Sequence, residues 1–330
     1  MRWGILGPGR IARAFLTGLA RSRTETAVAV GSRDVGRAKA VAADLAVPRA
    51  YGSYDDLLAD GEVEAVYIAL PNALHAEWSD AAARAGKHVL CEKPLGRSAA
   101  EVERMFGTAH GHGVVLMEAF MYRFHPRTLR LAELVTAGEV GQVRLVRGAF
   151  GFTVTDASNV RLSAELAGGA LMDVGCYPVS VARMLAGRPT RVSAVARWAP
   201  TGVDETLAGT LEHADAALSQ VSCSLTTSHH QVVQVVGTGG VVDVPQAFTP
   251  PADRPSKLVL TRGVRGGEPE ELTFEPIDQY TAEAEGFARL VAAGRDAVGL
   301  PRVSPVESLD NAATIDALLR SARESRPTDV

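Results

Sequence analysis

The chain of 330 residues is poor in cysteine, balanced in charge and free of long apolar runs. Its three cysteines are widely spaced and include no Cys-x-x-Cys pair, which argues against a disulfide framework and a zinc site. A net charge of −4, with both signs interspersed, disfavours nucleic acid and anionic membranes as partners. No run reaches the roughly 18 apolar residues of a membrane span, and the first strand begins too early for a signal peptide. We therefore expect a cytoplasmic protein without a metal site or a membrane segment.

The first 120 residues alternate short apolar strands with alanine-rich helices. Strands that are apolar throughout and separated by helices are typical of a parallel sheet covered on both faces. The predicted strands are 2–6, 28–32, 64–70, 87–91 and 114–117, and the helices between them include 35–45, 73–85 and 99–110. We predict a doubly wound, Rossmann-type NAD(P)-binding domain over residues 1–120.

Beyond about residue 140 the pattern changes to strand-like runs joined by turn residues, after one helix at 169–186. These runs predict an antiparallel or mixed sheet; they are 191–197, 207–212, 217–225, 230–236, 241–244, 257–260 and 271–274. Helices near 279–293 and 304–325 close the chain, and a helix over 121–137 bridges the two parts. We predict a second, α+β domain over 121–330 for substrate binding and dimerisation, with a C-terminal helix that can pack back on the first domain.

A glycine-rich turn follows the first strand directly. The sequence from Gly7 to Ala12 is Gly-Pro-Gly-Arg-Ile-Ala, and it leads into a segment with helical periodicity. Gly7 permits a tight turn, Gly9 lets the backbone approach a pyrophosphate, and the small Ala12 lets the helix pack on the strand. The helix N-terminus adds N–H groups and the positive end of its dipole. This context predicts a dinucleotide site, although such a turn also occurs as an ordinary strand-to-helix connection.

The end of the second strand bears on which dinucleotide is bound. Sites that prefer NAD place a carboxylate there, on the ribose 2′-hydroxyl. Ser32 and Arg33 occupy those positions here, and a hydroxyl followed by a guanidinium suits a 2′-phosphate. We infer NADP(H) as the preferred cofactor. The alternative, in which Arg33 is a solvated loop cation and Asp34 caps the next helix, leaves NAD(H) open.

Two later strand ends carry polar residues. One strand runs into Pro71 and Asn72, at the carboxyl edge where open α/β sheets bind ligands. Asn72 either lies along the cofactor or caps the following helix, and His75 in the first turn of that helix is equally compatible with a structural role. Glu92 and Lys93 end another apolar strand, where burial disfavours both charges unless they pair or serve a site. An ion pair between these two is the structural alternative.

A partner for Lys93 is present in the run Gly-Gly-Ala-Leu-Met-Asp-Val-Gly-Cys-Tyr-Pro at 168–178. Asp173 and Tyr177 are four positions apart, so on a helix they share one face. A phenol with a pKa of about 10 exchanges protons poorly near neutrality, but a neighbouring ammonium would lower that pKa. Lys93 and Tyr177 would therefore form an acid/base unit that interconverts an alcohol and a carbonyl. Alternatively, Asp173 and Tyr177 only tie this helix to the sheet.

Together these motifs resemble the Gfo/Idh/MocA family of oxidoreductases over essentially the full length of the chain. The resemblance rests on the loop at 7–12, Glu-Lys-Pro at 92–94, Met-Glu-Ala-Phe-Met-Tyr-Arg-Phe-His-Pro at 117–126, Asn-x-Arg-Leu at 159–162 and the run at 168–178. Within the family the chain is most similar to the branch of glucose–fructose oxidoreductase, dihydrodiol dehydrogenase, xylose dehydrogenase and sugar-nucleotide ketoreductases. That branch carries tyrosine where inositol dehydrogenases carry histidine.

The resemblance implies a Rossmann domain followed by an α+β domain whose large, open, mostly antiparallel sheet makes dimer contacts, and hence a homodimer or homotetramer. It also implies Lys93 and Tyr177 as the catalytic pair and Asp173 as a contact for sugar hydroxyls. The bond into Pro94 is often cis in this family. Glucose–fructose oxidoreductase has an N-terminal arm that clasps its cofactor, and this chain lacks the arm, so we expect NADP(H) to exchange with solution.

We predict an NADP(H)-dependent oxidoreductase that transfers a hydride between nicotinamide and a carbinol or carbonyl carbon of a sugar, sugar derivative or cyclic diol. The predicted catalytic residues are Lys93, Tyr177 and Asp173. The predicted cofactor-binding residues are Gly7, Pro8, Gly9, Arg10, Ile11, Ser32, Arg33, Leu70, Pro71, Asn72, His75, Glu92 and Lys93. The predicted substrate-binding residues are Tyr122, Arg123, Arg161, Asp173 and Tyr280. Two alternatives are a cofactor-binding regulator without turnover and an NAD-using enzyme that cleaves glycosidic bonds.

Overall fold

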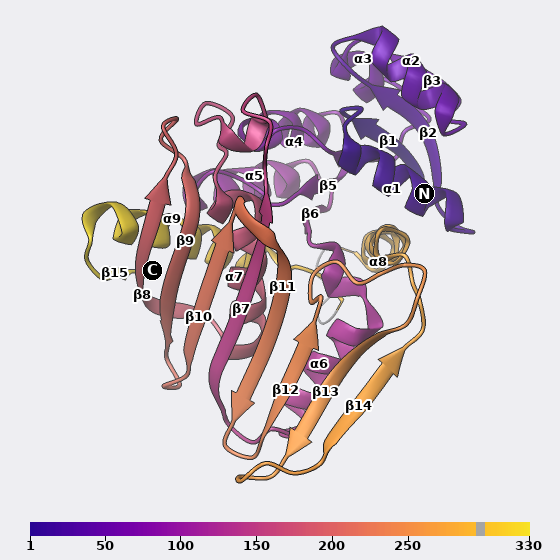
Figure 1. Cartoon of the computed structure of the whole chain (residues 1–330). Helices are drawn as coiled ribbons and strands as arrows, with labels where there is room; N and C mark the ends of the chain where they lie inside the picture. The colour runs from indigo at the N-terminus through magenta and orange to yellow at the C-terminus, as the bar shows by residue number, and fades with distance from the viewer. Residues whose placement is uncertain (295–300) are drawn as a thin grey trace. The chain divides into compact units, whose positions relative to one another are not determined.

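The computed structural model describes residues 1–294 and 301–330, and its elements are labelled in Figure 1. The chain divides into two compact units, each built from two segments. The first unit comprises Met1–Phe124 and Ile277–Pro305, and the second comprises His125–Pro276 and Val306–Val330. None of the helices within the described residues combines the length and apolarity needed to cross a membrane.

The sheet of the first unit is parallel, with six strands among the described residues in the order β3-β2-β1-β4-β5-β6. The strands are β1 (Arg2–Leu6), β2 (Thr26–Gly31), β3 (Arg49–Tyr51), β4 (Ala65–Ile68), β5 (His88–Glu92) and β6 (Leu116–Ala119). The strand order reverses between β1 and β4, and ligands bind at the carboxyl ends of the strands beside such a reversal. The ends of β1, β2, β4 and β5 are therefore where a site is expected.

The helices of this unit begin and end at sequence signals. They are α1 (Arg10–Arg21), α2 (Val35–Asp44), α3 (Tyr54–Leu58), α4 (His75–Arg84), α5 (Ala99–Gly111) and α8 (Gln279–Ala293), with 3-10 turns η1 (Asn72–Leu74) and η2 (Met121–Phe124). Ser98 caps α5, because its Oγ accepts the N–H of Glu101 at 3.2 Å. Gly86 follows α4 with φ +73°, the left-handed conformation that glycine adopts without strain.

Aromatic packing explains why α8 joins the first unit although it lies late in the sequence. The ring of Phe15 on α1 stacks on Tyr67 of β4 at 3.8 Å between centroids. Trp3 of β1 lies 5.3 Å from Phe15 and 5.4 Å from Phe287 of α8. All four side chains are fully buried. Burial of a large aromatic side chain stabilises a fold by roughly 1.5–3 kcal/mol, so α8 supplies part of the core of this unit.

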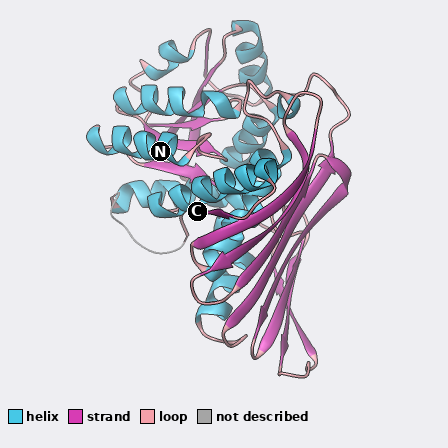
Figure 2. Cartoon of the chain, turned by 90° about the vertical axis from the view of Figure 1, so that its left-hand side faces the viewer, coloured by secondary structure: helices cyan, strands magenta, loops and turns pink. Residues whose placement is uncertain are grey.

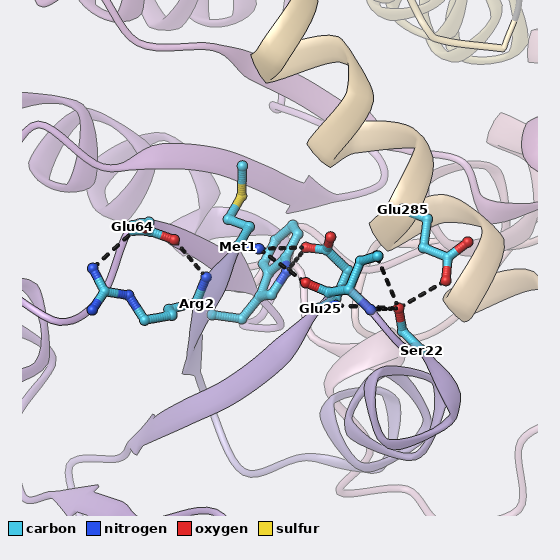
Figure 3. A network of polar contacts seen from close by, with 8 residues as sticks. Met1, Arg2, Ser22, Glu25, Glu64 and Glu285 are labelled. Atoms are coloured by element: carbon cyan, nitrogen blue, oxygen red, sulfur yellow. Dashed lines mark hydrogen bonds and ion pairs between the residues drawn. The ribbon is translucent and has the colours of Figure 1, made fainter.

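Polar contacts at the start of β2 secure the same helix (Figure 3). The hydroxyl of Ser22, which follows α1, donates to Glu285 of α8 at 2.7 Å. Glu25 accepts a hydrogen bond from the indole N–H of Trp3 at 2.9 Å and lies 3.4 Å from the amino group of Met1. The N-terminal strand, the first helix and α8 are thereby joined by side chains that the sequence separates widely.

The sheet of the second unit is the large magenta sheet of Figure 2. It is mixed, with nine strands among the described residues in the order β14-β13-β12-β11-β7-β10-β9-β8-β15 (Figure 1). Only β7 and β10 pair in parallel; every other described neighbour pair is antiparallel. The strands are β7 (Val143–Thr153), β8 (Pro189–Trp198), β9 (Asp204–His213), β10 (Leu218–Ser224), β11 (Thr226–Gly237), β12 (Gly240–Pro245), β13 (Ser256–Arg262), β14 (Pro269–Phe274) and β15 (Thr328–Asp329).

Helices of the second unit cover one face of this sheet. They are α6 (Pro126–Thr136), α7 (Cys176–Ala186) and α9 (Pro305–Glu324), with a 3-10 turn η3 (Val160–Leu162) and a π-type turn η4 (Leu171–Gly175). α7 packs on β7 and β10, and a Cβ on Gly148 of β7 would lie 2.7 Å from Cβ of Pro178. α9 packs on β9, where a Cβ on Gly209 would lie 2.7 Å from Leu318. Glycine thus permits close approach of helix and strand at both contacts.

The fold class predicted from the sequence is confirmed, with local differences. The helix predicted over 121–137 is wrong as one element: it is η2 followed by α6, because Pro126 starts a new helix and holds the preceding His125 in an extended conformation. The prediction missed the strand β7 and the short elements β3 and α3. The helix predicted from 169 begins as the π-type turn η4 before α7.

Candidate functional site

The loop between β1 and α1 has the geometry of a phosphate-binding turn. Gly7 has φ +98°, and a Cβ there would lie 2.8 Å from the carbonyl oxygen of Ala69, so glycine is required. Gly9 is the N-cap of α1, and among the described residues no side chain caps that helix and no atom lies within 4 Å of a Cβ placed at Gly9. An open helix N-terminus of this kind fits the pyrophosphate of a dinucleotide.

Ser32, Arg33 and Asp34 follow β2 at the same edge. The Oγ atom of buried Ser32 accepts the N–H of Asp34 at 3.2 Å. Asp34 caps α2, because its Oδ1 accepts the N–H groups of Gly36 at 2.8 Å and Arg37 at 3.3 Å. The carboxylate is therefore engaged by the helix, whereas Arg33 is exposed. With Asp34 used in this way, the exposed guanidinium suits a 2′-phosphate.

The loop after β4 lies beside the loop after β5, because these two strands are parallel neighbours. Leu70 and Pro71 are half-buried at this edge. Asn72 begins the 3-10 turn η1, and the N-cap of α4 is Leu74, so Asn72 is not the cap of that helix. Pro8 and Ile11 of the first loop are half-buried and Arg10 is exposed. These positions bring the predicted cofactor residues of the first unit to one sheet edge.

Lys93 follows β5 directly and is half-buried, and the Lys93–Pro94 peptide bond is cis. His75 is fully buried beneath this loop. Its Nδ1 lies 2.8 Å from the carbonyl oxygen of Pro94, and its Nε2 lies 2.9 Å from that of Leu70. The ring thus links the loops after β4 and β5 from inside the fold.

Two phenols and a second carboxyl group gather around Glu92, the residue before Lys93. The hydroxyl of Tyr67 donates to the carboxylate of Glu92. Glu283 of α8 is fully buried, and neither of its oxygens has a hydrogen-bond partner within the described residues. Burial raises the pKa of Glu283 well above its ordinary value, and the charge of Glu92 raises it further. The same two causes raise the pKa of Tyr67 and of Tyr280. Glu283 therefore holds its proton to higher pH than an ordinary glutamate does.

In the second unit, Asp173 forms an ion pair with Arg161. Nε of Arg161 donates to Oδ2 of Asp173 at 2.6 Å, and the guanidinium carbon lies 5.6 Å from the ring centroid of Phe152. Asp173 belongs to η4, and π-type turns inside helices are frequent at functional sites. The ion pair fixes the direction of the carboxylate that was predicted to contact substrate hydroxyls.

Tyr177, in the first turn of α7, belongs to an aromatic cluster. Its ring centroid lies 5.4 Å from that of Phe150 and 5.2 Å from that of Phe248. The phenol side chain is buried, as are both phenylalanines. Such packing restricts the rotamers of Tyr177 and surrounds its ring with apolar groups.

Sequence reasoning missed Asp204, which supports this helix start. The carboxylate of Asp204 accepts the N–H of Leu171 at 2.7 Å and lies against Gly169, where φ is +118° and a Cβ would collide with Oδ1. Burial raises the pKa of Asp204. The conspicuous Gly-Gly pair before the helix was the available signal, because a glycine at such a position indicates a close neighbour. The sequence alone does not show that this neighbour is Asp204.

The predicted site residues are divided between the two units. Lys93, Tyr122, Arg123 and Tyr280 belong to the first unit, and Arg161, Asp173 and Tyr177 belong to the second. Tyr122 and Arg123 are buried in η2, where Arg123 donates to the carbonyl of Arg302 at 3.1 Å. The convergence of Lys93 with Tyr177 stays a prediction.

Metal-ligating side chains are dispersed in the described ranges, where no group of three or more His, Cys, Asp and Glu residues is placed to hold an ion. The cysteines Cys91, Cys176 and Cys223 are buried thiols. Burial raises the pKa of Cys91 and of Cys223, so both remain thiols at neutral pH. They are small apolar core residues.

Each of the two units contains a range that matches a known protein family. Residues 1–120 match the family described as "Oxidoreductase family, NAD-binding Rossmann fold", and residues 128–243 match the "GFO/IDH/MocA C-terminal domain". The two matched ranges cover the glycine-rich loop and Lys93 in one case, and Asp173 and Tyr177 in the other.

Individual relatives cover most of the chain. A D-xylose 1-dehydrogenase (NADP(+)) of Haloferax volcanii is 45% identical over 98% of this chain and 97% of its own length. The mouse trans-1,2-dihydrobenzene-1,2-diol dehydrogenase is 38% identical over 76% of each chain. Among solved structures, a 3-ketoreductase from Actinomadura kijaniata in complex with NADP and TDP-benzene superposes with a TM-score of 0.88 at 31% identity, over 97% of both chains.

Proposed function

Because the chain belongs to the Gfo/Idh/MocA family of oxidoreductases, we propose that it transfers a hydride between NADP(H) and a carbinol or carbonyl carbon of a sugar, sugar derivative or cyclic diol. The observation that carries the proposal is the carboxyl edge of the parallel sheet. There the open N-terminus of α1 at Gly9 and the side chain of Lys93 follow strands of the same sheet. A helix N-terminus open to a pyrophosphate and an ammonium group at one sheet edge suit a nicotinamide enzyme.

The proposed cofactor preference rests on the residues after β2. Arg33 is exposed and suits a 2′-phosphate, because Asp34, the carboxylate next in sequence, is bound to the N–H groups of α2. The xylose dehydrogenase relative is named for NADP(+), and the structurally similar ketoreductase was solved with NADP, which supports the same preference. NAD(H) remains usable, because Ser32 offers no repulsion to a 2′-hydroxyl.

The proposed chemistry assigns one task to each side chain. When bound, NADP(H) supplies or accepts the hydride. Tyr177 gives or takes the hydroxyl proton of the substrate, and Lys93 lowers the pKa of that phenol by its positive charge. Asp173, held by Arg161 at 2.6 Å, accepts hydrogen bonds from substrate hydroxyls. Dihydrodiol and xylose dehydrogenases among the relatives support a polyhydroxylated or cyclic diol substrate.

The direct test follows the absorbance of NADPH with purified protein and a panel of aldoses, ketoses and cyclic diols, in both directions. Lys93→Met and Tyr177→Phe should each lose turnover by about 100-fold or more, the contribution typical of acid/base groups, while the Kd for NADPH stays unchanged. Wild-type turnover in both variants would refute the acid/base pair. Cofactor binding without oxidation or reduction of any compound would favour the regulator, and bond cleavage without net change in NADPH would favour the glycoside-cleaving enzyme.

We further propose that the chain assembles as a homodimer or homotetramer through the open face of the nine-stranded sheet. Val195 is 72% exposed and Val232 is 41% exposed on that face, and both line a hollow of about 730 Å³. Exposed apolar groups over a hollow commonly mark an interface. A second copy that packs there would remove these side chains from water.

A further inference from the structure

His75 makes two contacts that one neutral imidazole cannot satisfy together. Nδ1 faces the carbonyl oxygen of Pro94 at 2.8 Å, and Nε2 faces that of Leu70 at 2.9 Å. Both partners are acceptors only. A neutral imidazole has one N–H and one lone pair, so it donates to one carbonyl and turns its lone pair toward the other.

A second buried histidine in the same chain shows what a satisfied neutral ring looks like. Nδ1 of His213 faces the carbonyl oxygen of Gly187 at 2.9 Å, and Nε2 faces the hydroxyl of Ser219 at 2.8 Å. A hydroxyl donates as well as accepts, so the neutral ring satisfies both partners by donating to Gly187 and accepting from Ser219. Both histidines are buried, and the difference between them lies in the second partner.

Protonation of the ring does not resolve the conflict at neutral pH. Burial lowers the pKa of His75, and Lys93 lowers it further, while the two carbonyls and Glu101 of α5 oppose that change without cancelling it. His75 is therefore neutral near pH 7, and its single proton must be placed on one of the two nitrogens.

The difference in burial between the two carbonyl contacts determines which nitrogen of His75 carries the proton. The contact with Pro94 is buried, whereas the contact with Leu70 is only partly buried. A buried carbonyl that lacks a donor destabilises the fold by about 1–3 kcal/mol, while a carbonyl near solvent can bind water. The fold is therefore more stable with the proton on Nδ1, where it forms a hydrogen bond with the buried carbonyl of Pro94.

We propose that His75 is a positioning residue: as the Nδ1–H tautomer it binds the carbonyl of Pro94 and so fixes the backbone that carries Lys93. This assignment rests on the proposed function for the role of Lys93. It predicts that the hydrogen bond to Pro94 matters for turnover and that the contact with Leu70 does not. His75 would then act from inside the fold without touching cofactor or substrate.

Two substitutions separate the two contacts, because the amide of asparagine reaches the place of Nδ1 and that of glutamine reaches the place of Nε2. We expect kcat of His75→Gln to fall about tenfold below that of His75→Asn, the effect of one lost hydrogen bond on the transition state, with the same KM for NADPH in the two variants. His213→Asn is the matched control and should keep the wild-type kcat. Equal kcat in the Asn and Gln variants would overturn the proposal.

A measurement without turnover keeps the proposal testable if the proposed activity fails. Long-range ¹H–¹⁵N spectra of the wild-type protein labelled at histidine distinguish protonated from unprotonated ring nitrogens, and His75→Asn identifies the signals of His75. We expect the proton on Nδ1 at pH 7, and a proton on Nε2 would overturn the assignment. Amide exchange of Leu95, whose N–H donates to Glu118 at 3.1 Å in the same loop, should accelerate in His75→Gln and not in His75→Asn. If the wild-type protein shows no turnover but these two measurements give the expected results, the proposed oxidoreductase activity is rejected and the tautomer assignment of His75 stands.

Discussion

The carboxylate of Asp204 on β9 accepts the backbone N–H of Leu171 at 2.7 Å, at the start of the turn that leads to Tyr177. Helix N-termini leave N–H groups without partners inside the helix, and a remote carboxylate replaces the usual local cap here. Gly169 leaves the space that Asp204 fills. The direction of α7, and with it the placement of Asp173 and Tyr177, therefore depends on a strand of the sheet.

Removal of that carboxylate should destabilise the second unit. Asp204→Ala leaves the buried N–H of Leu171 without an acceptor, so the free energy of unfolding should fall by about 1–3 kcal/mol in urea denaturation. Asp204→Asn keeps an acceptor and should lose less. Asp215→Ala, at an exposed position of the turn between β9 and β10, is the control and should stay within about 0.5 kcal/mol of wild type. Equal stability of Asp204→Ala and the control would contradict the cap.

Arg33 should set the preference for NADP(H). Loss of a charge-assisted hydrogen bond weakens binding by about 1.5–3 kcal/mol, so Arg33→Ser should raise the Kd for NADPH by about 10- to 100-fold and leave the Kd for NADH unchanged. Fluorescence titration of both cofactors measures this ratio. Arg37→Ser removes a second exposed cation, on α2, and should change neither Kd by more than about twofold. A parallel loss of NADH and NADPH affinity would show that Arg33 does not read the 2′-phosphate.

The open face of the large sheet should carry the subunit contact. Val195→Glu places a charge on that face, and burial of an unpaired charge in an interface is strongly unfavourable. We expect sedimentation velocity to show a smaller species than wild type at the same concentration. Val264→Glu, at a position 88% exposed in the turn between β13 and β14, should assemble as wild type does. If the two variants assemble identically, the interface does not lie on this face of the sheet.

The sequence predicted best those elements whose signals are local. Apolar strands of the first unit were found because both faces of a parallel sheet are buried, and the caps at Ser98 and Gly86 act within a few residues. The strand β7 was missed because Gly148 and Gly151 interrupt its apolar pattern. Both glycines are explained only by distant partners, Pro178 of α7 and His230 of β11.

The same limit applies to the candidate site. Gly7, Gly9 and Lys93 stand in short motifs whose chemistry follows from their neighbours in the sequence. Asp204 and Glu283 are buried beside residues that are far away along the chain, and a single acid in an ordinary strand or helix gives no sign of such a neighbour. Their roles follow from burial and hydrogen bonding, which a folded structure supplies.

Glu283 should make the fold less stable as the pH rises. Below the ordinary glutamate pKa of 4.5, folded and unfolded chains both hold the proton, and the group has no pH-dependent effect. Above that value the unfolded chain releases the proton while the buried carboxyl, whose pKa is raised by burial and by Glu92, retains it. The free energy of unfolding then falls by up to about 1.4 kcal/mol per pH unit until the raised pKa is passed. Glu283→Gln has no proton to lose, so its stability relative to wild type should increase in urea denaturation as the pH rises above the ordinary glutamate pKa of 4.5. Glu285→Gln, on the same helix but bonded to Ser22, is the control, and a pH-independent difference for Glu283→Gln would show that the carboxyl is ionised in the native fold.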